Sequence, residues 1–239
     1  IPDPLWSRGL GDVYKRQIMS WGPMKIFLDT AETDVVRKHF KTGLIDGLTT
    51  NPTLIRKSGR KHEDVYQEFK EIGVTDLSME VIGNAENMIS EGKRLHRKFG
   101  KMATIKVPCT VDGLVACKEL SKDNIRVNVT LIFSPSQAIL AAKAGAAYIS
   151  PFVGRVEDNS FDGVALIKDI AAIYRKQYIT KTQVLAASLR DVHSVSRCYA
   201  DGADIVTMPP AVFEKMYKHI LTDKGLEQFD IDYAESVKE

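Results

Sequence analysis

The stretch ATIKVP at Ala103–Pro108 is a short apolar run that contains one lysine. Its β-branched residues predict a buried strand, and Pro108, which lacks the N–H that a central strand needs, is expected to follow its end. Lys106 is therefore predicted at the C-terminal end of a buried strand, where lysines are rare unless they are paired or used. Burial disfavours the charged form of an amine, and a neutral amine is a nucleophile for carbonyl carbon. This stretch alone leaves two interpretations open, a lysine that forms an ion pair and a lysine that forms a Schiff base.

Strand-like segments of this kind recur along the chain, and amphipathic helical segments separate them. The predicted strands are Lys25–Asp29, Gly47–Thr50, Leu77–Val81, Ala103–Val107, Arg126–Ile132, Tyr148–Pro151, Gln183–Ala187 and Ile205–Thr207. Eight strand–helix repeats predict an α/β fold, a single (β/α)8 TIM barrel. A doubly wound open sheet is the alternative, but no GxGxxG motif follows the first strand, which argues against its dinucleotide-binding form.

The two ends of the chain differ from the repeats. Residues 1–23 have no periodic apolar pattern and lack the layout of a signal peptide. We expect them to be a disordered or non-native extension, followed by the catalytic barrel domain at 24–239. The residues from about 223 predict one more amphipathic helix, which has no place in the eightfold count. We expect that helix to pack across the barrel or onto a neighbouring subunit.

Composition excludes several classes of function. The 239 residues are 44% hydrophobic and 27% charged, with a net charge of +2, which is typical of a globular protein without a nucleic-acid surface. No apolar stretch reaches the length of a membrane span. Three sparse cysteines without a CxxC pair favour a reducing, cytoplasmic environment. The carboxylates and histidines are scattered, so neither a metal nor another cofactor is predicted.

Polar residues recur where the predicted strands end, at the face where barrel enzymes place their sites. They are Asp29, Thr49, Asn51, Glu80, Lys106, Asn128, Thr130, Ser150, Arg155, Ser188 and Arg190. Polar groups inside apolar strands are costly unless they are paired or used, so their recurrence predicts a site. One amine among two carboxylates suits imine formation with proton transfer. Two arginines after late strands suit a substrate phosphate.

Most of these residues also have a structural explanation. The alternatives are a helix cap for Asp29 and Ser188, a turn for Asn51, strand propensity for Thr49 and a surface ion pair for Arg155. Glu80 is the hardest to explain in this way, because it lies between Met79 and Val81 in an apolar strand.

Six ordered motifs make the chain similar to a known family. They are LDTA at Leu28–Ala31, TTNP at Thr49–Pro52, IKVP at Ile105–Pro108, NVTLIFS at Asn128–Ser134, ISPFVGR at Ile149–Arg155 and AASLRD at Ala186–Asp191. Together they resemble the transaldolase family, in particular its short subgroup, which also contains fructose-6-phosphate aldolases. The resemblance runs from Lys25 to the C-terminal helix.

The resemblance implies a class I aldol mechanism without a cofactor. It implies that Lys106 forms the Schiff base, that Asp29 is the acid–base group at the sugar C4 hydroxyl, and that Glu80 and Thr130 hold a catalytic water. The implied substrate-binding residues are Asn51, Asn128 and Ser150 at the dihydroxyacetone unit, Arg155, Ser188 and Arg190 at the phosphate, with Thr49 and Phe152 beside them. It also implies a homo-oligomer, a pentamer or decamer, with phosphorylated sugars as ligands.

Two residues bear on the branch of the family. The aldolase branch resembles a pattern with Gln at the Glu80 position and Tyr at the Phe152 position, so this chain resembles the transaldolases. The implied reaction moves a dihydroxyacetone unit from fructose 6-phosphate or sedoheptulose 7-phosphate to erythrose 4-phosphate or glyceraldehyde 3-phosphate, in the pentose phosphate pathway. The alternatives are a fructose-6-phosphate aldolase that releases free dihydroxyacetone, and a non-catalytic barrel that serves as a scaffold.

Overall fold

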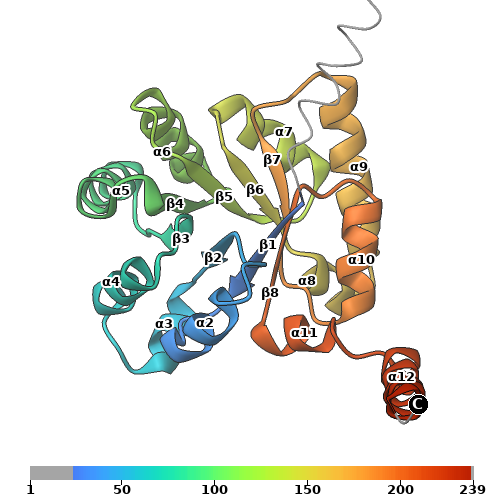
Figure 1. The fold of residues 1–239 in the computed structure, drawn as a ribbon. Helices are drawn as coiled ribbons and strands as arrows, with labels where there is room; N and C mark the ends of the chain where they lie inside the picture. The colour runs from blue at the N-terminus through green and yellow to red at the C-terminus, as the bar shows by residue number, and fades with distance from the viewer. Residues whose placement is uncertain (1–23, 238–239) are drawn as a thin grey trace, which may run out of the picture.

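The computed structural model describes residues 24–237 and forms a closed barrel of eight parallel strands (Figure 1). The strands are β1 (Lys25–Asp29), β2 (Gly47–Thr49), β3 (Leu77–Glu80), β4 (Ala103–Pro108), β5 (Val127–Ile132), β6 (Tyr148–Pro151), β7 (Gln183–Ala186) and β8 (Ile205–Met208). They pair in chain order, and β8 closes the barrel on β1. The predicted TIM barrel is therefore confirmed, with strand bounds within one residue. The expectation for residues 1–23 lies outside the described residues.

Helices surround the barrel and follow the strands (Figure 1). They are α2 (Thr33–Phe40), α3 (Pro52–Ser58), α4 (His62–Ile72), α5 (Ala85–Phe99), α6 (Val111–Lys122), α7 (Pro135–Ala144), α8 (Val153–Asp158), α9 (Gly163–Lys176), α10 (Val192–Ala200), α11 (Pro210–Lys215) and α12 (Ile220–Ser236), with a 3₁₀ turn, η1, at Gly100–Met102. The short helices α3 and α8 were not predicted. Both begin shortly after a strand: the predicted site residue Asn51 is the N-cap of α3, and α8 contains Arg155.

Pro108 is the last residue of β4, where the sequence suggested that it would follow the strand. The prediction was wrong by one residue, because Pro108 still pairs in register with Thr130 on β5. Proline lacks a backbone N–H, but at the last position of a strand this loss does not interrupt the hydrogen bonds of the residues before it. Lys106 keeps its predicted place near the C-terminal end of the strand.

The barrel interior below the site is filled by a large ring beside a glycine. Phe27 and Gly47 are paired in register on β1 and β2, two residues before Asp29 and Thr49, so the four residues share one face. A Cβ on Gly47 would lie 2.6 Å from Cζ of Phe27, which leaves no room for any other residue there. Phe27 packs with Tyr148, Leu185 and residues nearby in a small cluster of its own. This cluster supports the polar layer above it.

A polar network closes the opposite, N-terminal end of the barrel. The buried carboxylate of Asp76 accepts hydrogen bonds from the Thr104 hydroxyl at 2.7 Å, the Tyr148 hydroxyl at 2.6 Å and Arg126 at 2.9 Å. Each oxygen of the carboxylate is used, which satisfies a group that would otherwise be costly to bury. The network links the segments that precede or begin β3, β4, β5 and β6.

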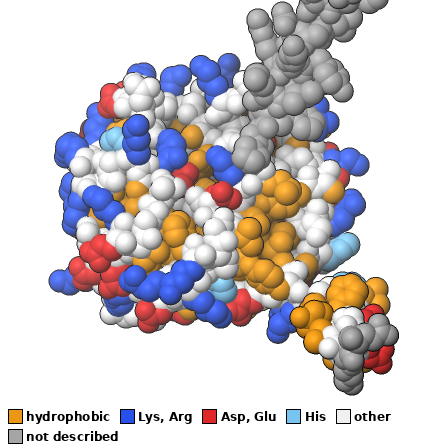
Figure 2. Space-filling view, in the orientation of Figure 1, with side chains coloured by type: hydrophobic (Ala, Val, Ile, Leu, Met, Phe, Trp, Pro, Cys, Tyr) orange, Lys and Arg blue, Asp and Glu red, His pale blue; other side chains and the backbone are white. Residues whose placement is uncertain are grey.

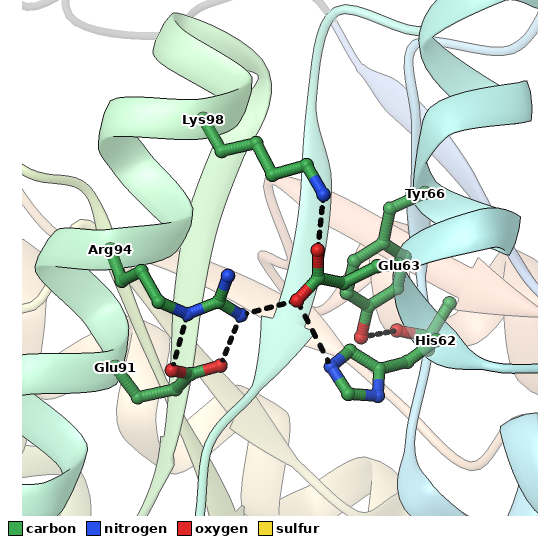
Figure 3. Close-up of polar contacts among 7 residues, drawn as sticks. His62, Glu63, Tyr66, Glu91, Arg94 and Lys98 are labelled. Atoms are coloured by element: carbon green, nitrogen blue, oxygen red, sulfur yellow. Dashed lines mark hydrogen bonds and ion pairs between the residues drawn. The ribbon is translucent and has the colours of Figure 1, made fainter.

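An ion-pair network joins α4 to α5 on the outside of the barrel (Figure 3). Glu63 pairs with Lys98 and with Arg94, and the Arg94 guanidinium also binds Glu91 through two nitrogens. The hydrogen bond from Lys98, followed by that from Arg94, lowers the pKa of Glu63 to about 2. The network therefore favours the ionised form of Glu63 at neutral pH.

The final helix, α12, begins at Ile220, a few residues before the predicted start near 223, and the His219 side chain caps it. No residue of α12 is buried, and the helix extends beyond α11 at the edge of the barrel (Figure 1). Figure 2 shows hydrophobic side chains gathered on it. Its exposed apolar residues are Ile220, Leu221, Leu226, Phe229, Ile231 and Tyr233. Within residues 24–237, no helix is long and apolar enough to cross a membrane.

Candidate active site

Lys106 and Glu80 form a buried ion pair inside the barrel. They occupy paired register positions on β4 and β3, and 2.9 Å separates Nζ of Lys106 from Oε2 of Glu80. The two side chains are only 6% and 15% exposed, so solvent screens the pair little. Nζ also donates to the backbone carbonyl of Thr50 at 3.0 Å. The amine therefore has a carboxylate within reach that can take its proton.

Asp29 lies in the same cavity as Lys106 and ends β1. Its Oδ1 accepts a 2.7 Å hydrogen bond from the Thr49 hydroxyl, and Thr49 Oγ1 lies 2.7 Å from Thr207 Oγ1 on β8. Burial raises the pKa of Asp29, while Lys106 and the Thr49 hydrogen bond act in the opposite direction. Asp29 does not cap α2, whose N-cap is Glu32. A carboxyl group with a raised pKa beside a lysine suits proton transfer to and from a substrate.

A polar cavity connects these groups with the later strands. Its lining combines hydroxyl, amide, carboxylate and cationic groups with one aromatic ring. The lining residues are Asp29, Thr49, Asn51, Lys106, Ser150, Phe152, Arg155, Ala187, Ser188 and Thr207. Most of the residues that the sequence predicted for the site are thus brought together at the C-terminal ends of the strands.

Asn51 serves both the fold and the cavity. Its side-chain oxygen accepts a 3.0 Å hydrogen bond from the Leu54 N–H, which caps α3. Asparagine at the N-cap followed by proline at the first helical position is a strong helix start, so the structural role of Asn51 is a helix cap and not the turn considered as the alternative. The amide nitrogen of Asn51 remains as a donor at the cavity.

Asn128 and Ser150 form a buried pair on β5 and β6. The Ser150 hydroxyl donates to Oδ1 of Asn128 at 2.7 Å, and Nδ2 of Asn128 donates to the Ser78 hydroxyl at 3.1 Å. Ser150 lines the cavity, whereas Asn128 lies behind it and is fully buried. Asn128 therefore orients the Ser150 hydroxyl through its amide oxygen.

Thr130 differs from the other buried hydroxyls. Its Oγ1 is buried and has no hydrogen-bond partner among the described residues. Such a group is costly unless something binds it, and a water molecule is the usual partner. The next residue, Leu131, has a positive φ of 59°, where the register between β5 and β6 shifts. This irregularity lies directly beside the site.

The helix α8 brings an aromatic ring and a guanidinium to the cavity. The Arg155 guanidinium lies 5.0 Å from the centre of the Phe152 ring, which is a cation–π arrangement. Phe152 also meets the half-exposed Phe133 edge to face at 5.8 Å. Arg155 has no carboxylate partner among the described ion pairs, unlike the surface pair considered as its alternative. Its charge is therefore available to an anion in the cavity.

Arg190 lies in a different arrangement from Arg155. Its two terminal nitrogens bind both carboxylate oxygens of Asp158, the last residue of α8, and its side chain is not part of the cavity lining. The side chain crosses Gly154, where a Cβ would lie 3.0 Å from Nε of Arg190 and 2.3 Å from the Ser188 carbonyl oxygen. Asp191 caps α10 through the N–H of Ser194, so its carboxylate is engaged there.

Ser188 adopts a strained conformation at the cavity. Its φ is +59°, a left-handed value that is uncommon for serine, and it does not cap α10. Backbone strain of this kind is often concentrated at functional sites. The N–H of Gly154 donates to the Ser188 carbonyl at 3.1 Å, which ties α8 to the end of β7.

Thr207 is a cavity residue that the sequence reasoning missed. Strand β8 contains no charged residue, so nothing in it stood out. The signal was available in the alternation of side chains along a strand, which puts Thr207 on the same face as Ile205 inside the barrel. A threonine on that face near the end of the last strand necessarily meets the site.

Comparison with known proteins gives a consistent result. A family model described as "Transaldolase/Fructose-6-phosphate aldolase" matches residues 26–239. A protein of Caulobacter vibrioides (strain NA1000 / CB15N) named "Probable transaldolase" is 53% identical over 212 residues, covering 88% of this chain and 97% of that protein. A "Probable transaldolase" of Nitrosopumilus maritimus (strain SCM1) is 49% identical, covering 90% of this chain and 96% of that protein.

Two solved structures share the fold. A flavocytochrome b2 variant with sulfite bound has a TM-score of 0.58 at 13% identity, covering 81% of this chain and 58% of that chain. The carboxyl transferase domain from Rhizobium etli pyruvate carboxylase has a TM-score of 0.59 at 14% identity, covering 80% and 40%. The chain spans less than two thirds of either, and the likeness concerns the barrel alone. The family match and the near-complete coverage of the relatives lead to one conclusion: the chain belongs to the transaldolase/fructose-6-phosphate aldolase family and is an enzyme of the aldolase type.

Proposed function

We propose that the protein is a transaldolase that transfers a dihydroxyacetone unit between phosphorylated sugars through a Schiff base on Lys106. The observation that carries the proposal is the buried amine of Lys106, 2.9 Å from Glu80 and in one cavity with Asp29. An amine beside a proton acceptor and a second carboxyl group is the set that imine chemistry needs. The names of the relatives, "Probable transaldolase", support the same activity.

The first step is imine formation. Glu80 takes a proton from the Lys106 ammonium, and the free amine attacks the C2 carbonyl carbon of the ketose phosphate. Glu80 returns that proton to the hydroxyl of the resulting carbinolamine, which leaves as water while the nitrogen lone pair forms the protonated imine. The orphaned hydroxyl of Thr130, on the strand next to β4, supports a role with Glu80 in holding that water. Hydrolysis of the imine at the end of the cycle uses the same groups in reverse.

The second step breaks the C3–C4 bond of the bound sugar. Asp29 accepts the proton of the C4 hydroxyl as the bond breaks, the aldose phosphate leaves, and the electron pair of the bond remains in an enamine on Lys106. An acceptor aldehyde then binds, the enamine carbon attacks it, and Asp29 returns the proton to the new hydroxyl. The raised pKa of Asp29 favours this exchange in both directions. Asn51 and Ser150, with Asn128 behind it, hold the hydroxyl groups of the three-carbon unit.

The substrate phosphate binds between the ends of β6 and β7. Arg155 and Ser188 line the cavity there and are available to an anion. Arg190 joins them by exchanging Asp158 for the phosphate, an exchange favoured by the exposure of the pair to solvent. We propose fructose 6-phosphate or sedoheptulose 7-phosphate as donor and erythrose 4-phosphate or glyceraldehyde 3-phosphate as acceptor, as in the pentose phosphate pathway.

The fate of the enamine separates a transaldolase from a fructose-6-phosphate aldolase. Release of free dihydroxyacetone requires protonation of the enamine carbon, and the Phe152 ring in the cavity has no proton to give. The test supplies fructose 6-phosphate and measures free dihydroxyacetone with and without erythrose 4-phosphate. Transfer to the acceptor much faster than release supports the transaldolase. Release of dihydroxyacetone without an acceptor at a rate equal to or above that of transfer identifies an aldolase. Absence of both release and transfer would favour the non-catalytic barrel that serves as a scaffold.

We further propose that copies of the chain associate through α12, in a pentamer or a decamer. The helix exposes a row of apolar residues, with Phe229 69% exposed, and buries none. Helices α6 and α7 of the same chain expose the apolar residues Val111, Val115, Ile139 and Leu140, which can receive it from a second copy. Sedimentation should give a mass far above 26.6 kDa. Phe229→Glu should dissociate the assembly and Gln228→Glu should not, whereas a monomeric wild type would refute this proposal.

We place the reaction in the cytoplasm. The thiols of Cys109, Cys117 and Cys198 are free, and two of them are buried. Free cysteines without disulfide partners suit a reducing compartment. Fractionation of the source cells, with activity followed by the transfer assay, tests the location.

A further inference from the structure

A chain of hydroxyl groups leads from the last strand of the barrel to Asp29. Thr207 Oγ1 on β8 lies 2.7 Å from Thr49 Oγ1 on β2, which in turn lies 2.7 Å from Asp29 Oδ1 on β1. Thr207 and Thr49 are each 3% exposed, so solvent hardly competes for these bonds. All three residues line the cavity that contains Lys106.

The number of available protons determines which hydroxyl donates in each of these hydrogen bonds. A hydroxyl has one proton to donate, and an ionised carboxylate can only accept. When Asp29 is ionised, the proton of Thr49 is committed to Oδ1. The oxygen of Thr49 must then be the acceptor in its bond with Thr207, and Thr207 must be the donor.

This direction matters for the ionised state of Asp29. A hydroxyl that accepts a hydrogen bond becomes a better donor, so Thr207 strengthens the bond from Thr49 to the carboxylate. Hydrogen bonds to the charged form of a carboxyl group favour that form. Burial raises the pKa of Asp29, and the Thr49 bond counteracts it. The chain also ties β8 to β2 across β1, which limits the rotation of the Asp29 side chain.

Besides the hydroxyl groups of Thr49 and Thr207, few charged groups act on Asp29. Lys106 on β4 lowers its pKa, Glu80 on β3 raises it, and Arg155 shares the cavity. The neighbouring strands β2 and β8 contain no charged residue. On α11, which packs beside β1, Glu214 is paired with Lys38 and His39.

We infer that Thr207 is a positioning residue for Asp29: through the hydroxyl of Thr49 it holds the carboxylate in one orientation and favours its ionised form. The inference rests on the proposed role of Asp29 as the acid–base group of the transfer reaction. Thr207 touches no reacting atom in this scheme, and its effect reaches the substrate only through Thr49 and Asp29.

The test compares Thr207→Val, which keeps the shape and removes the hydroxyl, with Thr207→Ser, which keeps the hydroxyl. Thr104→Val is the matched control, because Thr104 also donates a buried 2.7 Å hydrogen bond to a carboxylate, that of Asp76, at the other end of the barrel. The measurements are the pH profile of kcat/KM for transfer, the melting temperature, and the amount of borohydride-trapped imine on Lys106.

Thr207→Val should move the acidic limb of the pH profile to higher pH and lower transfer by about two- to tenfold, the worth of one hydrogen bond. It should leave imine trapping intact, because that step uses Lys106 and Glu80. Thr207→Ser should restore the wild-type pH profile. Thr104→Val should lower the melting temperature but leave the pH profile unchanged. If Thr207→Val folds poorly, Thr49→Val, which removes the middle of the chain, should shift the limb in the same direction.

Three outcomes would overturn the inference, and each is distinguishable from the others. If Asp29→Asn keeps full transfer activity, the proposed role of Asp29 fails and this inference fails with it. If Asp29→Asn abolishes transfer while folded Thr207→Val and Thr49→Val keep the wild-type pH profile, the inference about Thr207 alone is overturned. An equal shift in Thr104→Val would show a general effect of destabilisation and would also overturn it.

Discussion

Glu80 and Lys106 are paired in register on adjacent parallel strands, with 2.9 Å between the carboxylate oxygen and the amine nitrogen. The backbone ladder between β3 and β4 fixes this separation, so the pair does not depend on the conformation of a loop. In the proposed mechanism, this bond places the proton acceptor of Lys106 against its amine before a carbonyl arrives. It also makes the two interpretations of Lys106 compatible, since the ion pair is itself a part of the proposed chemistry.

Lys106→Met should abolish transfer, because Lys106 is the one lysine among the described residues that line the cavity. Borohydride with fructose 6-phosphate should trap a three-carbon adduct on Lys106 in the wild type, detected by peptide mass spectrometry. Lys25→Met is the control, since Lys25 starts β1 at the other end of the barrel. An adduct on another lysine, or activity in Lys106→Met, would contradict the assignment.

Glu80→Gln should slow imine formation by about 10²- to 10⁴-fold, the usual worth of a positioned acid–base group. The amide keeps the shape of the side chain and can no longer take the proton of Lys106. Stopped-flow trapping of the imine separates this step from the later ones. Imine formation at the wild-type rate would mean that Glu80 serves only to pair with the lysine.

Arg155→Ala should raise KM for fructose 6-phosphate by about tenfold or more, because a charged hydrogen bond to the phosphate is lost. It should change little for unphosphorylated dihydroxyacetone as donor. Arg197→Ala is the control, since Arg197 pairs with Asp201 on the surface. Equal effects on both donors would assign Arg155 to the structure of α8.

Asp158→Asn should lower KM for phosphorylated sugars by about two- to fivefold, because it releases Arg190 from a competing carboxylate. Asp158 and Arg190 form the pair, and the pKa of Asp158 lies below its usual value because of that hydrogen bond. Competitive inhibition by inorganic phosphate gives the same information without turnover. Weaker phosphate binding in Asp158→Asn would instead mean that the pair holds Arg190 in its working position.

Phe152→Tyr should raise the ratio of dihydroxyacetone release to transfer, because the added hydroxyl brings a proton donor or an ordered water to the enamine. Phe133→Tyr is a matched control, since the two rings touch but Phe133 does not line the cavity. Both products are measured in one assay with erythrose 4-phosphate present. An unchanged ratio in Phe152→Tyr would remove residue 152 as a determinant of the branch.

The Glu63 network should stabilise the fold above about pH 4.5 and lose its effect in acid. The pKa of Glu63 is about 2 in the folded protein against 4.5 for the free group. The stabilisation is therefore lost as the pH falls from 4.5 to about 2. Glu63→Gln should cost about 1 kcal/mol at pH 7, a few degrees of melting temperature. The gap to the wild type should narrow towards pH 3. Glu119→Gln, which breaks a single pair with Lys122, should have a smaller effect.

Much of this fold could be predicted because its signals are local and repeated. Each strand of the barrel is a short apolar run, and eight of them in order leave few architectures. The short helices α3 and α8 were missed because they follow strands at once and bury little apolar surface. The start of α3 was in fact signalled by the cap at Asn51.

The candidate site was predictable as a set of residues and not as a set of contacts. The polar strand ends lie together because the barrel brings all carboxyl ends of its strands to one face. The partners of individual groups depend on side chains far apart in the sequence: Arg190 binds Asp158, and Asn128 turns towards Ser78. No pattern in a single sequence specifies such pairs.

The bond between Thr49 and Thr207 joins residues 158 positions apart and crosses the seam at which the barrel closes. During synthesis, Lys106 and Glu80 can meet as soon as β3 and β4 pair, long before β8 has left the ribosome. The orientation of Asp29 has to wait for that last strand. An incomplete barrel would thus contain the pair of Lys106 and Glu80 but not the orientation of Asp29 on which the proposed bond cleavage depends. Transfer activity should for this reason return during refolding only after β8 has docked. The time course of its recovery would then report the closure of the barrel.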